Sequence, residues 1–359
     1  EYNGKFYAFQ GGASGLAEVL NGKNISLTVQ VMLDYSDVTE NLINSKARNK
    51  GHELYSWENG SKESREWIEA MFCWLSENMS GTTSPKNYAS NWILGNEVNS
   101  YNNYQYSGSM SRGEFFKSYT ETYRSYYNAI KSYNSEAKVY ICADQSWNST
   151  ENGYSAKDLL DTCANLFMDM ERGTMDWNIA YHPYSYPLIS RALWENTNIQ
   201  DDVNTTYITM YNLDVLTDYI KRNYYHEGAD GEIKVPMVII SELGWTYKNN
   251  AQNQAASLVY GYYISACNEL VVAYEPRSMF DAPQEAANGL YFGMLNNSGS
   301  PRGSLQAYRE CDVSIDTPYY ELVNPQATGW TMLNGIEGHI PEGNSFEDIV
   351  LRNDNYVAP

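Results

Sequence analysis

The sequence predicts an α/β fold of the (β/α)8-barrel type, and three observations lead to this prediction. Short apolar runs alternate with amphipathic stretches at helical spacing, which is typical of parallel strands joined by helices. Two of these runs, residues 92–97 and 238–242, end in a glutamate, as buried parallel strands do when they carry an acid to the edge of a sheet. No repeat or low-complexity linker interrupts the chain, so we expect a single domain over residues 1–359.

Six strands are expected, each from a short apolar run. They begin at Ile25, Trp92, Val139, Trp177, Val235 and Leu270. A closed (β/α)8 barrel needs eight strands. If the runs 92–97 and 238–242 are the fourth and seventh strands, the first two are missing or irregular at the N-terminus. Either residues 5–10, which resemble a hairpin, supply one of them, or they precede Glu1.

Helices are expected between the strands. Ser61 is a typical N-cap residue for one of them, and Ser155 with Asp158 forms a variant capping box for another that runs to Met170. The apolar face expected for the helix after Ser61 consists of Trp67, Met71, Trp74 and Leu75. A helix over residues 113–133 places Phe116, Tyr119, Tyr123, Tyr127 and Ile130 on one side, which favours packing in the core over ligand binding. Two more helices are expected, one from Asn212 and one over residues 252–267.

Composition narrows the classes of partner. The formal net charge is −20 and the isoelectric point about 4.5, so nucleic acids and acidic membranes would be repelled. The 33 tyrosines suit a carbohydrate ligand, which offers C–H faces for stacking and hydroxyl groups for hydrogen bonds. The acidic composition favours a secreted or cell-surface protein. No run of about 18 apolar residues is present, so we expect no membrane span. The sequence does not indicate an oligomeric state.

The cysteines and histidines argue against a metal site or a redox cofactor. The five cysteines are Cys73, Cys142, Cys163, Cys267 and Cys311, without C-x-x-C spacing. Several of them lie in apolar runs, and Cys142 and Cys163 form a disulfide only if the fold brings them together. The four histidines are scattered without ligand spacing, so we expect neither a metal nor another cofactor.

The ends of three expected strands resemble clan A of the glycoside hydrolases, whose members are retaining (β/α)8-barrel enzymes. In that clan an asparagine and the acid/base glutamate end the fourth strand, as Asn96 and Glu97 do here, and the nucleophile ends the seventh, as Glu242 does. Between them, His182 and Tyr184 resemble the His-x-Tyr of cellulase-like members. The resemblance spans residues 25–274 and implies a carbohydrate substrate and no cofactor.

The resemblance also implies roles for these residues. Glu242 would attack the anomeric carbon, and Glu97 would protonate the leaving oxygen and then activate water. The negative charge of the nucleophile would raise the pKa of Glu97 and keep it protonated near neutral pH. Asn96 would bind the sugar 2-hydroxyl, Tyr184 would hold Glu242, and His182 would line the same subsite.

Further substrate-binding candidates lie at the expected strand ends. They are Trp245, a stacking candidate, together with Asp34 and Trp147. After the last expected strand, Arg277 stands near the position where many clan members have a tryptophan, which bears on the sugar preference. The alternative to an enzyme is a non-catalytic carbohydrate-binding or cell-surface module on a degenerate barrel, which the shortage of strands favours.

Overall fold

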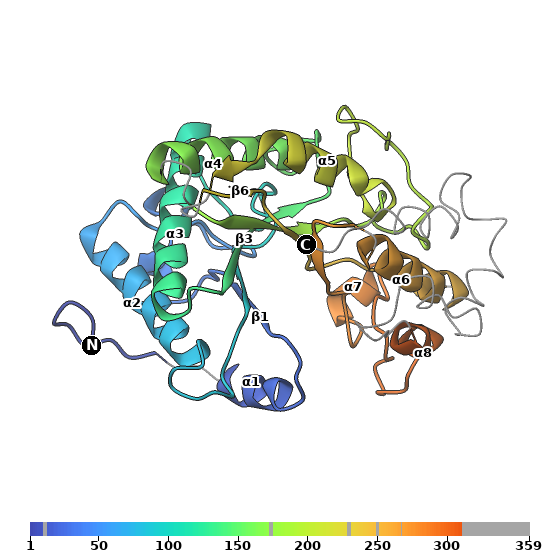
Figure 1. Ribbon diagram of the computed structural model, residues 1–359, viewed down its shortest axis with the longest axis horizontal. Coiled ribbons are helices and arrows are strands. Elements are labelled where there is room, and N and C mark those ends of the chain that lie inside the picture. The colour runs from blue at the N-terminus through green and yellow to red at the C-terminus, as the bar shows by residue number, and fades with distance from the viewer. Residues whose placement is uncertain (10–12, 172–174, 228–230, 249–250, 267, 311–359) are drawn as a thin grey trace. The chain divides into compact units, whose positions relative to one another are not determined.

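A computed structural model describes residues 1–9, 13–171, 175–227, 231–248, 251–266 and 268–310 (Figure 1). The chain divides into two compact units. The first unit comprises residues 1–144, 149–180 and 224–236, and the second comprises residues 145–148, 181–223 and 237 onward. Each unit is therefore assembled from segments that are distant in sequence. The expected single domain over residues 1–359 stays a prediction.

The first unit contains the strands β1 to β4 in that order. Their bounds are Thr28–Val31 for β1, Asn91–Leu94 for β2, Lys138–Asp144 for β3 and Trp177–His182 for β4, of which the last two residues belong to the second unit. β1 pairs with β2 and β2 with β3 in parallel, so that Leu94 lies opposite both Val31 and Ile141. Every residue of β3 after Lys138 is buried, as expected for a strand covered on both faces. A separate antiparallel pair joins His226–Glu227 (β5) to Ile233–Lys234 (β6).

Helices of the first unit connect these strands. They are α1 (Ala13–Asn21), η1 (Glu40–Leu42), η2 (Ser45–Ala47), α2 (Lys62–Met79), α3 (Arg112–Tyr133) and α4 (Ala156–Glu171). α2 packs on α3 and α3 on α4 (Figure 1). The expected caps are confirmed: the Ser61 hydroxyl accepts a hydrogen bond from the Ser64 N–H, and the Ser155 hydroxyl accepts one from the Asp158 N–H, both at 3.0 Å.

The expected apolar face of α2 is wrong in part. The residues that α2 buries include Ile68, Ala70, Phe72 and Met79, whereas Trp67 is 38% exposed. Aromatic residues of the N-terminal segment contact the other face, where Phe9 stacks on Trp74 at 5.3 Å between ring centroids and Tyr7 meets Trp67 edge-on. Residues 5–9 therefore pack on a helix instead of forming a strand of the sheet, and only an isolated bridge joins Tyr2 to Lys5 there.

The second unit contains the end of β4 and two further strands. Its elements are η3 (Met210–Asn212), α5 (Asp214–Asn223), β7 (Val238–Ile240), α6 (Ala251–Ala266), β8 (Val271–Tyr274), α7 (Pro283–Ala287) and α8 (Gly303–Glu310). β7 follows β4 in strand order, and the Ser241 N–H donates to the Tyr181 carbonyl at 3.3 Å. β7 pairs with β8 in parallel, with an irregularity between Val238 and Ile239. α6 packs against β8 and α8 (Figure 1).

All six expected strands are confirmed, each within three residues of its expected start. Parallel strands that alternate with helices, six of them in the part of the chain described, form part of a (β/α)8 fold. Cys142 and Cys163 are buried free thiols, so they form no disulfide with each other, and burial raises the pKa of Cys163. Cys267 and Cys311 lie outside the described residues. No described helix has the length and apolar character needed to cross a membrane.

Candidate active site

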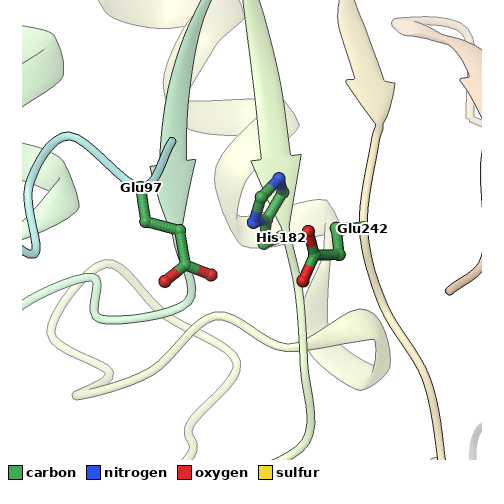
Figure 2. Close-up of side chains that lie close together, drawn as sticks. All are labelled: Glu97, His182 and Glu242. Carbon is green, nitrogen blue, oxygen red and sulfur yellow. The ribbon is translucent and has the colours of Figure 1, made fainter. Parts of the chain in front are cut away.

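The turn after β2 carries Glu97 in an unusual backbone conformation. Glu97 has a φ of +40°, in the left-handed region that residues other than glycine rarely adopt. Such a conformation costs about 1–3 kcal/mol, and residues that adopt it are enriched at active sites. Gly95, two residues earlier, has a φ of +81°, so the chain reverses sharply where the buried strand ends. Glu97 is half-buried, and its side chain is drawn in Figure 2.

Asn96 is oriented from the neighbouring strand β1. Its Oδ1 accepts a hydrogen bond from Gln30 Nε2 at 2.9 Å, and the same nitrogen donates to the Gly95 carbonyl at 2.9 Å. This contact fixes which way the Asn96 amide faces. Within the described parts of the chain, Asn96 Nδ2 has no hydrogen-bond partner, so its two hydrogens are available to a ligand hydroxyl.

Glu242 lies two residues after β7 and is held through one of its two oxygens. The Tyr184 hydroxyl donates a hydrogen bond to Glu242 Oε1 at 2.8 Å, and Arg277 Nη1 lies 3.6 Å from the same oxygen. The Tyr184 ring is 5% exposed and packs tilted against Phe292. Oε1 is therefore fixed by one hydrogen bond and one ion pair, which come from different segments of the second unit.

Arg277 connects Glu242 to a second carboxylate. It follows β8, and its backbone N–H donates to the Leu243 carbonyl at 2.7 Å, directly after Glu242. Its Nη2 donates to Glu285 Oε1, on α7, at 2.6 Å. Burial alone lowers the pKa of Arg277, but Glu242, Tyr184 and Glu285 together raise it above its ordinary value. The guanidinium thus stays charged between two carboxylates.

His182 ends β4 and is fully buried. One of its ring nitrogens lies within 4.8 Å of a Glu242 carboxylate oxygen, and Figure 2 shows both side chains at the ends of their strands. A buried imidazole beside a carboxylate can hold a proton, contribute a ligand to a metal ion or bind a hydroxyl group. Among the predicted site residues that lie in the second unit, the structure thus brings His182, Tyr184 and Glu242 together.

The remaining candidates lie elsewhere. Trp245 is 1% exposed, and its Nε1 donates to the Ser185 hydroxyl at 2.9 Å. Trp147 is fully buried, its Nε1 donates to the Val203 carbonyl, and its ring contacts that of Tyr219 edge-on. Both indole rings pack in the interior, because their N–H groups find buried partners there, and neither offers an open face for a sugar. Asp34 is exposed in the loop after β1.

Two residues around Glu242 were not among the predicted site residues. The sequence indicates only that Arg277 follows an expected strand, and Glu285 lies in a short helix with no sequence signal for a role at this site. The one available signal for Arg277 was that a charged residue follows an apolar run at an expected strand end.

Comparison with known proteins gives a family for the chain. A family model described as a family of unknown function, DUF5722, matches residues 1–330. The chain belongs to this family. A search of the curated proteins finds no match to this DUF5722 member.

Solved structures resemble the chain at low sequence identity. A family 39 glycoside hydrolase from the gut symbiont Bacteroides cellulosilyticus WH2 has a TM-score of 0.54 and 18% identity, over 86% of this chain and 54% of that one. A glucosidase from Croceicoccus marinus has a TM-score of 0.51 and 13% identity, over 83% and 52%. The GH53 catalytic domain of Ignisphaera aggregans has a TM-score of 0.50 and 14% identity, over 82% and 76%.

These likenesses show a shared fold. The neighbours are clan A glycoside hydrolases, the clan that the strand ends resemble, which supports a partial (β/α)8 fold for this DUF5722 member. The chain spans about half the length of the first two solved chains that it matches, 54% and 52%.

Proposed function

We propose that this protein is a glycoside hydrolase that cleaves O-glycosidic bonds of an oligo- or polysaccharide with retention of configuration. The observation that carries the proposal is the carboxylate of Glu242, held at the end of β7 by the Tyr184 hydroxyl at 2.8 Å and by the Arg277 guanidinium at 3.6 Å. A nucleophilic carboxylate needs such fixing, because attack on an anomeric carbon succeeds only from a narrow range of positions.

In the proposed mechanism Glu242 is the nucleophile and Glu97 the acid/base. Glu242 Oε2 attacks the anomeric carbon while Glu97 donates a proton to the departing oxygen, which gives a glycosyl-enzyme. Glu97 then removes a proton from the water that releases the sugar. The mechanism requires the two carboxyl groups to stand roughly 5 Å apart in the working enzyme, whereas inversion would need roughly 6.5–9.5 Å.

The surrounding residues have roles in substrate binding. Asn96 Nδ2, oriented by Gln30, donates to the sugar 2-hydroxyl, and this contact strengthens in the transition state. His182 lines the same subsite. The solved structures that resemble the chain support the proposal, because all three are glycosidases or members of glycoside hydrolase families. A secreted or cell-surface location fits a polysaccharide substrate and is part of the proposal.

The test is kinetic and stereochemical. Wild-type protein is screened against polysaccharides and activated aryl glycosides, and the Glu97→Ala, Glu242→Ala and Glu53→Ala variants are compared on the best substrate. Glu53 is an exposed loop residue, so its variant controls for loss of a carboxylate anywhere on the protein. We expect both site variants to lose turnover and the control to keep it.

Azide separates the two roles. With Glu97→Ala, azide should attack the glycosyl-enzyme and give a glycosyl azide of retained configuration, whereas with Glu242→Ala it should attack the substrate directly and give the inverted product. Near wild-type turnover in both variants refutes the assignment. Sugar affinity that survives Glu242→Ala, in a protein that never turns over, indicates the carbohydrate-binding module instead.

A further inference from the structure

Asp144 is a buried carboxylate for which the proposed mechanism has no use. It is the last residue of β3 and is 4% exposed. Its Oδ1 accepts a hydrogen bond from Asn99 Nδ2 at 2.7 Å, and its Oδ2 accepts one from the Ser100 hydroxyl. Its backbone N–H donates to Asn99 Oδ1 at 3.0 Å. A carboxylate is buried at such a position only when hydrogen bonds satisfy both of its oxygens.

The partners of Asp144 belong to the turn that carries Glu97. Asn99 and Ser100 follow Glu97 by two and three residues, and the Ser100 N–H donates to the Glu97 carbonyl at 2.8 Å. The positive φ of Glu97 persists only where surrounding contacts fix the backbone. The contacts of Asp144 with Asn99 and Ser100 fix the end of this turn.

The start of the same turn is also bonded to β3. The Glu97 N–H donates to Cys142 Sγ at 3.2 Å, and the Val98 N–H donates to the Cys142 carbonyl at 3.0 Å. On a further side, the Tyr154 N–H donates to the Asn99 carbonyl at 2.9 Å, and a Cβ on Gly153 would lie 2.3 Å from that carbonyl oxygen. The turn is therefore held on several sides, and Asp144 accepts the two side-chain hydrogen bonds that hold its end.

We propose that Asp144 is a positioning residue, which holds the Glu97 carboxyl where it can protonate the departing oxygen. The inference rests on the proposed function. Asp144 does not touch the substrate; it acts through Asn99 and Ser100 on the backbone of Glu97. A displacement of about 1 Å in a catalytic group can lower the rate by about 10²-fold, so loss of these hydrogen bonds should be visible in the chemistry that Glu97 performs.

The test uses the Asp144→Asn variant. The new amide is uncharged and has one acceptor oxygen in place of two. Either its nitrogen faces the Asn99 nitrogen, or it faces Ser100 and that hydroxyl must turn to accept, so at least one of the two hydrogen bonds is lost or weakened. Displacement of an acid slows the departure of poor leaving groups, which need a proton, more than that of dinitrophenolate, which does not. We expect kcat/KM to fall about 10²-fold for alkyl glycosides or oligosaccharides and by less than about threefold for dinitrophenyl glycosides.

Two further variants make the test specific. The double variant Asn99→Asp with Asp144→Asn exchanges donor and acceptor in the hydrogen bond between the two side chains. It should recover most of the kcat/KM that Asp144→Asn loses. Ser100→Ala removes one of the two hydrogen bonds to Asp144. Its kcat/KM should also fall more for alkyl glycosides than for dinitrophenyl glycosides, but by a smaller factor. This variant replaces Asp144→Asn in the test if Asp144→Asn does not fold. Thr120→Val, which removes another buried hydroxyl of the first unit, is the stability control and should leave the pattern unchanged.

The outcomes distinguish the inference from the proposed function. Equal losses on both classes of substrate, or no loss, overturn the positioning role while the enzyme assignment stands. Wild-type protein without glycosidase activity overturns the assignment. Crystal structures then test the positioning separately, because φ of Glu97 should leave the left-handed region in the Asp144→Asn or Ser100→Ala variant, and an unchanged φ overturns the inference.

Discussion

Replacing Tyr184 with phenylalanine removes one hydrogen bond from Glu242 and keeps the aromatic ring. The ring is 5% exposed and packs against Phe292, so its packing should survive the change. The lost bond is 2.8 Å long and has a carboxylate acceptor. Hydrogen bonds to charged groups contribute about 1.5–3 kcal/mol, which corresponds to a loss of about ten- to hundredfold in kcat/KM.

The assay measures kcat and KM on an aryl glycoside beside the thermal unfolding midpoint. Tyr274→Phe is the matched control, because it also removes a tyrosine hydroxyl that donates one hydrogen bond, here to the Leu258 carbonyl at 3.0 Å. We expect both variants to unfold within a few degrees of the wild type and only Tyr184→Phe to lose activity. Equal activity in the two variants would refute the reasoning that the Tyr184 hydroxyl holds the nucleophile.

Three further predictions concern charge, backbone and pH. Arg277→Met removes the charge 3.6 Å from Glu242, and we expect kcat to fall about tenfold and no further, because the ion pair is partly exposed. Arg277→Lys keeps the charge and should recover part of the lost kcat. Gly95→Ala places a side chain at a φ of +81°, and chemical denaturation should show a loss of about 1–2 kcal/mol. Glu114 has its pKa lowered to about 2, first by a hydrogen bond from Lys46. Its stabilisation is present above the unfolded-state pKa of about 4 and is lost as the pH falls through about 2, so the urea midpoints of wild type and Glu114→Gln should converge between pH 6 and pH 2.

The strands and caps could be predicted because their signals are local. The β3 run is buried from Val139 to Asp144, and a strand covered on both faces has an apolar sequence whatever surrounds it. Ser61 and Ser155 bond to backbone groups three residues away, so their role is visible in a short window. The face of α2 was predicted less well, because Phe9 and Tyr7, far away in sequence, cover part of it.

The site residues also fall into those with a local sequence signal and those that depend on distant contacts. Glu97 and Glu242 stand out because each ends an apolar run, and the position of Tyr184 after β4 made its contact with Glu242 a reasonable expectation. Arg277 and Glu285 act through contacts that only the folded chain creates. Trp245 has the sequence position of a stacking residue, but a single hydrogen bond to Ser185 turns its ring inward, and no local pattern records such a contact.

The one-sided fixing of Glu242 has a spectroscopic consequence. If Oε2 forms the bond to the sugar, Oε1 becomes the carbonyl oxygen of the resulting ester, still facing the Tyr184 hydroxyl and the Arg277 guanidinium. Hydrogen bonds to an ester carbonyl weaken its double bond, so the ¹³C-edited infrared band of a trapped 2-fluoroglycosyl-enzyme should lie at lower frequency than that of an ordinary ester. In the proposed mechanism, the same hydrogen bond and positive charge would make the carboxylate a better leaving group in the second half of the reaction. In the proposed mechanism, Tyr184 and Arg277 would thus act on Glu242 both before the attack and during the release of the sugar.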